Sequence, residues 1–130
     1  MKKIMFNDKY GLTQAVLEGS KTQTRRIITN ETALALCEKG NFDLVWKHAS
    51  YFAGEVVAIA QSYDVVDDIL PYRMWSIETY RKIQNTPGWN NKMFVKADLM
   101  PHHIRITYIG VERLQSISIN DCLREGIKEV

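Results

Sequence analysis

Short apolar stretches separated by turn residues follow one another along the whole chain. Stretches rich in β-branched and aromatic residues predict strands. These predicted strands are residues 4–6, 42–46, 56–63, 93–97 and 104–114. The last is long enough to curve around a barrel, with Gly110 as a bend or bulge.

Helices are predicted where apolar residues recur at helical spacing beside capping residues. After a cap at Asp8, Leu12, Ala15 and Val16 have this spacing and stop at Gly19. Asn30 is expected to cap a second helix, which ends at Gly40. Residues 71–84 are also partly helical in pattern.

The end of the chain predicts another helix. Ser118 with Asp121 three residues later approximates a capping box, and the helix is expected to run through Glu125 and stop at Gly126. By contrast, residues 21–28 are polar and rich in threonine before ending in two isoleucines, which predicts an extended segment entering a sheet. Strands mixed with short helices, without regular βαβ alternation, favour an α+β fold.

Composition indicates one globular domain over residues 1–130. The chain is 45% hydrophobic and 25% charged, which is ordinary for a folded domain. Its two cysteines form no CxxC pattern, and the start builds no apolar export signal, so we expect a reducing, cytoplasmic location. The longest apolar run, residues 56–60, is far too short to cross a bilayer as a helix, so no membrane partner is expected.

The net charge of the chain gives little reason to expect high affinity for nucleic acid. The formal net charge is +2, from 17 basic and 15 acidic residues. A sequence-independent contact through bulk charge is therefore not expected, and any nucleic-acid contact must come from a local basic patch.

Two stretches resemble a known family. The run Gly-Ser-Lys-Thr-Gln-Thr-Arg-Arg at residues 19–26 resembles the G-x-K-T-x-T-R-R signature of the ASCH domain family. Met-Pro at 100–101, Arg-Ile at 105–106, Val-Glu-Arg-Leu at 111–114, Asp121 and Glu-Gly-Ile at 125–127 resemble the C-terminal half of ASCH proteins often encoded in phages and prophages.

This resemblance implies a small β-barrel related to the RNA-binding PUA domains, with flanking short helices. The family barrel usually continues with another strand after the late helix, so this domain is expected to lack that strand or to complete its site differently. Ser20 stands where the family often has a basic residue, which removes one phosphate contact. The family is proposed to act in RNA binding or processing.

One characterised ASCH relative is a small bacterial acetylcytidine amidohydrolase. Its working lysine, threonine and glutamate correspond by motif position to Lys21, Thr24 and Glu125. Amide hydrolysis needs a nucleophile, a base and a proton donor, roles these three residues could fill. Lys21 would need a lowered pKa, to which Arg25 or Arg26 could contribute. The alternative is that Lys21 and Thr24 lie on a solvated strand edge.

Arginines and one tryptophan are the further candidates for contact with nucleic acid. Guanidinium groups bind phosphates and stack on bases, and Trp89 follows a glycine in a predicted loop, where it could stack on a base. The candidates are Lys21, Arg25, Arg26, Arg105, Arg113 and Trp89. Neighbours in a strand face opposite sides, so we expect one of Arg25 and Arg26 to meet a ligand and the other to pair with an acid such as Glu112 or to form part of the scaffold.

No metal or other cofactor is expected. His102 and His103 diverge in an extended segment and have no cysteine or carboxylate at ligand spacing nearby. Three functions therefore stay open: an RNA- or nucleotide-binding module, an amidohydrolase acting on an acylated cytidine, and a phage accessory module that only binds protein. The sign of the third would be a broad apolar patch and a Lys21 side chain in open solvent.

Overall fold

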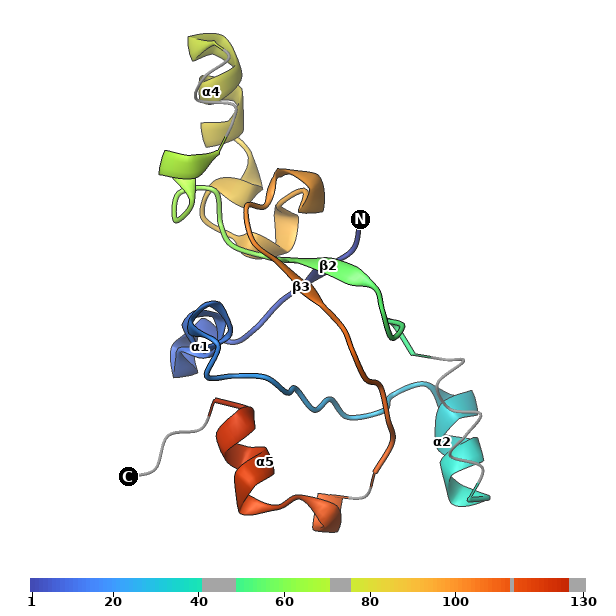
Figure 1. Cartoon of the computed structure of the whole chain (residues 1–130). Helices are drawn as coiled ribbons and strands as arrows, with labels where there is room; N and C mark the ends of the chain where they lie inside the picture. Colours follow the sequence, from blue (N-terminus) through green and yellow to red (C-terminus); the bar gives the residue numbers. More distant parts are fainter. Residues whose placement is uncertain (41–48, 71–75, 113, 127–130) are drawn as a thin grey trace. The chain divides into compact units, whose positions relative to one another are not determined.

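The computed structural model describes residues 1–40, 49–70, 76–112 and 114–126. Over these residues the chain forms four α-helices, a three-stranded sheet and several short 3-10 helices (Figure 1). The chain divides into two compact units. Unit 1 comprises Met1–Asp8 and the described part of Val56–Arg105, and unit 2 comprises the described parts of Lys9–Glu55 and Ile106–Val130.

The sheet belongs to unit 1 and has β2 (Val56–Ile59) at its centre. The strand β1 (Lys3–Ile4) runs parallel to β2 on one side, and β3 (His103–Arg105) runs antiparallel to it on the other. The β-branched residues of β2 suit the crowded centre of a sheet, and its residues Val57 and Ile59 are fully buried.

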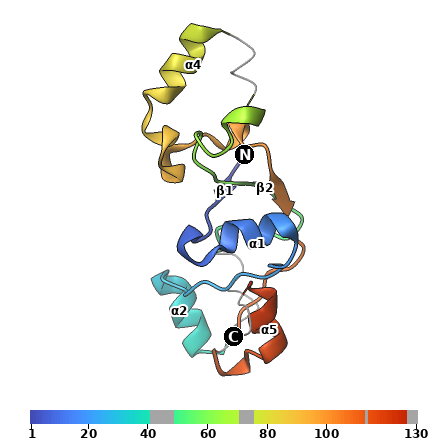
Figure 2. The same ribbon diagram turned by 90° about the vertical axis from the view of Figure 1, so that its left-hand side faces the viewer.

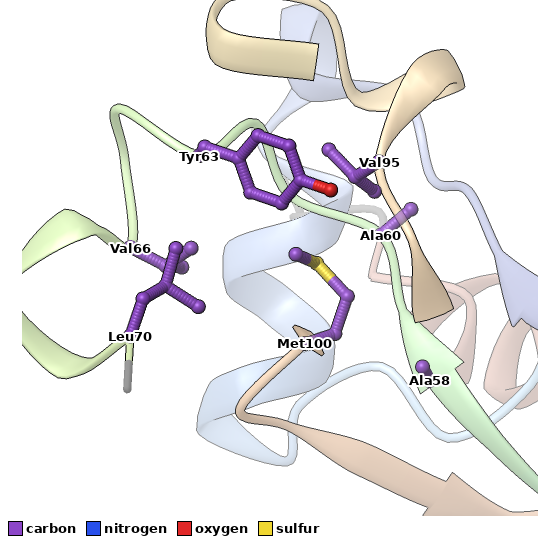
Figure 3. Close-up of a cluster of buried hydrophobic side chains, with 7 residues drawn as sticks. All are labelled: Ala58, Ala60, Tyr63, Val66, Leu70, Val95 and Met100. Atoms are coloured by element: carbon purple, nitrogen blue, oxygen red, sulfur yellow. The ribbon is translucent and has the colours of Figure 1, made fainter. Parts of the chain in front are cut away.

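An apolar cluster forms the core of unit 1 (Figure 3). Its buried members are Ala58, Ala60, Tyr63, Val66, Leu70, Val95 and Met100. The hydroxyl of Tyr63 accepts a hydrogen bond from the Lys96 main-chain N–H at 2.9 Å, so its polar end is satisfied inside the core. Gly88 lies against this ring, and a Cβ there would come within 2.7 Å of the Tyr63 Cε2.

Short helical elements complete unit 1 between β2 and β3. They are η3 (Asp67–Ile69), α4 (Ile77–Gln84), η5 (Pro87–Trp89), η6 (Lys92–Phe94) and η7 (Ala97–Leu99). The hydroxyl of Ser76 accepts from the Thr79 N–H at 3.1 Å and caps α4. The helical pattern predicted for residues 71–84 is therefore confirmed over 77–84, while residues 71–75 lie outside the described residues.

Unit 2 is built from three α-helices and the irregular segments between them (Figure 2). They are α1 (Leu12–Glu18), α2 (Glu31–Glu38) and α5 (Ile119–Arg124), with η8 (Leu114–Ser116) before the last. All three were predicted, because each carries its own local stop or cap. Gly19 ends α1 with φ 84°, and Asn30 caps α2 by accepting from the Ala33 N–H at 3.0 Å.

The predicted caps hold with one exception. Ser118 and Asp121 form a complete capping box at the start of α5. Asp8 does not cap α1: it begins the short 3-10 helix η1 (Asp8–Tyr10), and Gly11 is the N-cap residue of α1.

The predicted barrel is wrong for the described residues. Mixed α and β structure is present as expected, but the three strands form an open sheet with β1 and β3 as its two edges. These strands are only 2, 4 and 3 residues long. So short an open sheet does not close on itself, because a barrel needs its first and last strands to pair.

The long predicted strand over residues 104–114 is confirmed only at its start, where residues 104 and 105 belong to β3, and is wrong for the described residues beyond it. Two further hydrogen bonds extend the ladder after β3, from the Ile106 N–H to the Glu55 carbonyl at 2.9 Å and from the Gly54 N–H to the Ile106 carbonyl at 2.5 Å. Ahead of β2 the chain turns at Gly54, where φ is 89°, and residues 107–112 pair with no strand among the described residues. The predicted bulge at Gly110 has no strand to interrupt.

Three other strand predictions need correction. Residues 93–97 form parts of η6 and η7 instead, because the Asn91 side chain accepts from the Met93 N–H at 3.0 Å and starts a 3-10 turn. The predicted strands 4–6 and 56–63 are shortened to β1 and β2. Residues 21–29 have no regular secondary structure and do not enter the sheet, and 42–46 lie outside the described residues.

Candidate functional site

The candidate site lies in unit 2, where the segment after α1 meets the end of α5. Gly19 ends α1, and the chain then turns so that the Lys21 N–H donates to the Ala15 carbonyl at 3.0 Å. The Ser20 hydroxyl donates to the same carbonyl at 3.2 Å. These bonds use carbonyls that the end of a helix leaves without partners, and they fix the direction in which Lys21 leaves α1.

Main-chain hydrogen bonds tie this segment to α5. The N–H groups of Thr22 and Gln23 both donate to the Arg124 carbonyl, at 2.6 and 3.0 Å. Gly126 follows in the left-handed region with φ 91°, and a Cβ there would lie 3.3 Å from the Lys21 Cβ. The last turn of α5 therefore packs directly on the start of the 21–26 segment.

Lys21 is buried, with 7% of its surface exposed. Its ammonium group donates to the Gln23 carbonyl at 2.6 Å and to the Glu125 main-chain carbonyl at 2.8 Å. Burial lowers the pKa of Lys21 below the ordinary 10.5, the Glu125 carboxylate opposes this shift, and Arg26 adds to it. Lys21 can form both of these hydrogen bonds whether its amine is protonated or neutral, because a neutral amine still has two N–H donors.

Arg25 forms the second half of the site, at the centre of a group of acids. Its Nε donates to Glu112 Oε1 at 2.6 Å, and its Nη1 donates to Glu125 Oε1 at 2.6 Å and to the Gln23 side-chain oxygen at 3.2 Å. Its Nη2 lies 3.4 Å from Asp121 Oδ2. The hydrogen bonds that Arg25 donates to the Glu125 and Glu112 carboxylates raise the pKa of Arg25 further above its ordinary value, so it stays charged.

The capping box of α5 positions the acids of this group. Asp121 accepts from the Ser118 N–H at 3.1 Å, and the Ser118 hydroxyl accepts from the Asp121 N–H at 3.1 Å. The hydrogen bonds to Ser118 lower the pKa of Asp121, and Arg25 contributes to the same shift. Asp121 and Glu125 are four residues apart, so both project from one face of the helix toward the guanidinium.

The structure therefore brings together three predicted site residues, Lys21, Arg25 and Glu125. Thr24 and Arg26 lie in the same segment and are exposed. The expectation that one arginine pairs with an acid such as Glu112 is confirmed for Arg25. The alternative prediction, that Lys21 lies on a solvated strand edge, is wrong, because Lys21 is buried and belongs to no strand.

Other predicted residues lie elsewhere. Arg105 ends β3 in unit 1 and is exposed. Trp89 is also in unit 1, where its half-buried ring packs edge-on against Tyr80 with 6.1 Å between centroids. Arg113 lies outside the described residues, and so does the prediction that it shares a face with Arg105.

Sequence reasoning missed Gln23 and the second role of Asp121. Gln23 contributes a main-chain carbonyl to Lys21 and a side-chain oxygen to Arg25. Asp121 was identified only as a helix cap. The four-residue spacing between Asp121 and Glu125 was the signal that could have placed both acids on one face.

No group of three or more histidine, cysteine, aspartate or glutamate residues is placed to hold a metal ion in the described ranges. Within those same ranges, every helix is too short or too polar to span a membrane.

Comparisons with models of known protein families, with characterised proteins and with solved structures found no match to this chain.

Proposed function

We propose that this chain is an ASCH-type module that binds single-stranded RNA or a modified nucleoside, in RNA processing or modified-nucleoside metabolism. The binding face would be the 21–26 segment together with the end of α5. The observation that carries the proposal is the 2.8 Å hydrogen bond between the buried Lys21 ammonium and the Glu125 carbonyl. It joins the motif lysine to the late glutamate, which are 104 residues apart in sequence.

The groups gathered here match the needs of base recognition. A base edge presents hydrogen-bond donors and acceptors, and single-stranded bases leave these edges open. The Lys21 ammonium is a donor and the Glu125 carboxylate an acceptor, while the exposed Thr24 hydroxyl can be either. Arg26 is exposed in the same segment and supplies positive charge there.

Binding of a labelled single-stranded RNA oligonucleotide, measured at low and moderate salt, tests this proposal. Wild-type protein is expected to bind, more weakly at moderate salt. Arg26→Ala should weaken binding and reduce the slope of log affinity against log salt by about 1, since one phosphate contact is lost. Lys21→Ala should weaken binding as well.

Arg81→Ala is the matched control for Arg26→Ala. Arg81 is an exposed arginine of α4 in unit 1, so this variant loses the same charge outside the proposed face. Its binding should equal that of the wild type. Absence of binding at both salt concentrations, or equal losses in Arg26→Ala and Arg81→Ala, would contradict the proposal.

A second candidate function, hydrolysis of the amide of an acylated cytidine, is favoured by one observation. Burial lowers the pKa of Lys21, which brings this amine closer to use as a base, and Glu125 is next to it. The binding function is preferred because the Lys21 ammonium donates to two main-chain carbonyls, those of Gln23 and Glu125, which already use two of its donors in the folded site. A base would need to reach the proton of its nucleophile.

Incubation of the purified protein with acetylcytidine tests the enzyme directly. Hydrolysis consumes one water and yields cytidine and acetate, which chromatography separates. An enzyme should lose this turnover in Lys21→Ala and in Thr24→Ala. No product, or unchanged turnover in both variants, removes the candidate.

The protein-binding alternative is less well supported. Its expected sign was a Lys21 side chain in open solvent, and Lys21 is buried. Some large apolar side chains of unit 2 are mostly exposed, among them Ile27, Tyr108 and Ile119. They come from three separate segments of unit 2.

A further inference from the structure

Arg25 makes polar contacts with four side chains of the site, those of Gln23, Glu112, Asp121 and Glu125. Each of its three guanidinium nitrogens lies within 3.4 Å of a carboxylate oxygen, on Glu112, Asp121 and Glu125 respectively. The Arg25 side chain is 26% exposed. The guanidinium N–H groups that could bind a phosphate are thus already bonded to carboxylates of the protein itself.

The charges around Arg25 also oppose an anion. Three carboxylates surround one guanidinium, so a phosphate arriving there would meet a net negative surrounding and would have to displace a bonded carboxylate. This argues against the role predicted for Arg25 as a nucleic-acid contact. It leaves the question of what the guanidinium does in the site.

The carboxylate of Glu125 depends on Arg25 for its position. Glu125 is the C-cap residue of α5, at the negative end of the helix dipole, which mildly disfavours an acid. Its main chain is held by Lys21, but the bond to its carboxylate comes from Arg25 Nη1 at 2.6 Å. Arg25 therefore offsets the unfavourable end of the helix and selects one direction for this side chain.

Arg25 also fixes where its own segment lies. The bonds to Glu112 and Asp121 tie residues 21–26 to two further points of the later chain, ahead of α5 and within it. Loss of the guanidinium would leave three carboxylates close together without their shared cation. Their repulsion would move Glu125 away from the Lys21 ammonium.

We propose that Arg25 is a positioning residue, which holds the Glu125 carboxylate in place for the ligand and does not itself contact the ligand. This rests on the proposed function, because it assigns a role within the same binding face. Arg25 would act through Glu125, and Arg26 would act on the nucleic acid directly. The two adjacent arginines of the motif would thus have different tasks.

A double-mutant cycle tests this role, with the labelled single-stranded RNA as probe. Arg25→Ala and Glu125→Gln are each expected to weaken binding about tenfold. The double variant, Arg25→Ala with Glu125→Gln, should bind no more weakly than the weaker-binding of the two single variants. If Arg25 acts only through the Glu125 carboxylate, losing the guanidinium has no further effect once that carboxylate is gone. Arg25→Lys should recover part of the loss, since one ammonium can still hold Glu125.

The salt dependence separates positioning from direct contact. Arg25→Ala should leave the slope of log affinity against log salt unchanged, whereas Arg26→Ala should reduce it by about 1. A general loss of folding would not change the salt slope in one variant and leave it unchanged in the other. The free energy of unfolding of every variant is measured alongside, and Arg25→Lys provides the cycle if Arg25→Ala does not fold.

Two results would overturn the positioning role alone. One is a loss of RNA affinity in the double variant equal to the product of the two single losses. The other is a slope of log affinity against log salt that is reduced by about 1 in Arg25→Ala. Wild-type protein that does not bind the RNA at either salt concentration would overturn the proposed function, and this role with it. The two failures are therefore distinguishable in one set of measurements.

Discussion

At the scale of single residues, the burial of Lys21 is the feature on which the site depends. Removing an ammonium group from water is costly unless its donors are satisfied, and here the Gln23 and Glu125 carbonyls satisfy two of them. The carboxylate of Glu125 favours the charged form, and burial disfavours it more strongly. Lys21 should therefore give up its proton more readily in the folded protein than in the unfolded chain.

The lowered pKa of Lys21 makes the stability of the protein depend on pH in the alkaline range. The unfolded chain binds this proton up to pH 10.5, while the folded protein releases it at lower pH. Stability relative to a Lys21→Met variant should therefore rise as the pH increases from the folded pKa toward 10.5. Urea unfolding of both proteins at neutral and alkaline pH measures this. A difference that stays constant or shrinks with rising pH would contradict it.

Several site residues could be predicted from the sequence because they belong to recognisable motifs, not because their positions in space could be foreseen. Lys21 and Glu125 came from the resemblance, and the pairing of one arginine with Glu112 came from the alternation of neighbouring side chains. The contact of Gln23 with both Lys21 and Arg25 could not be predicted, because it depends on an irregular backbone. No periodic pattern specifies such a path.

At the scale of elements, helices were predicted more accurately than strands, whose lengths were overestimated. The helices α1, α2 and α5 carry their stop and cap signals within their own sequence. A strand needs a partner, and residues 104–114 have a good strand pattern, but within the described chain pairing is seen only at their start. Local pattern cannot show where along such a stretch the pairing among described residues stops.

The cap of α5 is expected to matter for binding as well as for stability. Ser118→Ala removes the hydroxyl that accepts from the Asp121 N–H, which should lower the free energy of unfolding by about 1 kcal/mol. It should also weaken RNA binding, because α5 carries the acids that surround Arg25. Thermal unfolding and the RNA titration measure the two effects.

Ser76→Ala is the matched control for Ser118→Ala. It removes the corresponding cap from α4 in unit 1, where the Ser76 hydroxyl accepts from Thr79 at 3.1 Å. It should cost a similar stability and leave RNA binding unchanged. If both variants weaken binding equally, or Ser118→Ala leaves it intact, α5 does not position the site.

At the scale of the whole molecule, total charge does not explain binding. A net charge of +2 gives little long-range attraction for a polyanion, so affinity must come from a few contacts within one face. The predicted barrel was an expectation from family resemblance, and long-range strand pairing is the kind of feature that local pattern does not encode. The described chain instead places its candidate site among helices and irregular segments of unit 2.

The most direct test of this account is a titration of isotope-labelled protein with single-stranded RNA and with acetylcytidine, followed by the amide signals in NMR. The account predicts that at least one of these probes shifts the amides of residues 21–26 and 119–126 together, and that Lys21→Ala removes both sets of shifts. Shifts confined to unit 1, for example around Trp89, or no shifts with either probe, would contradict it.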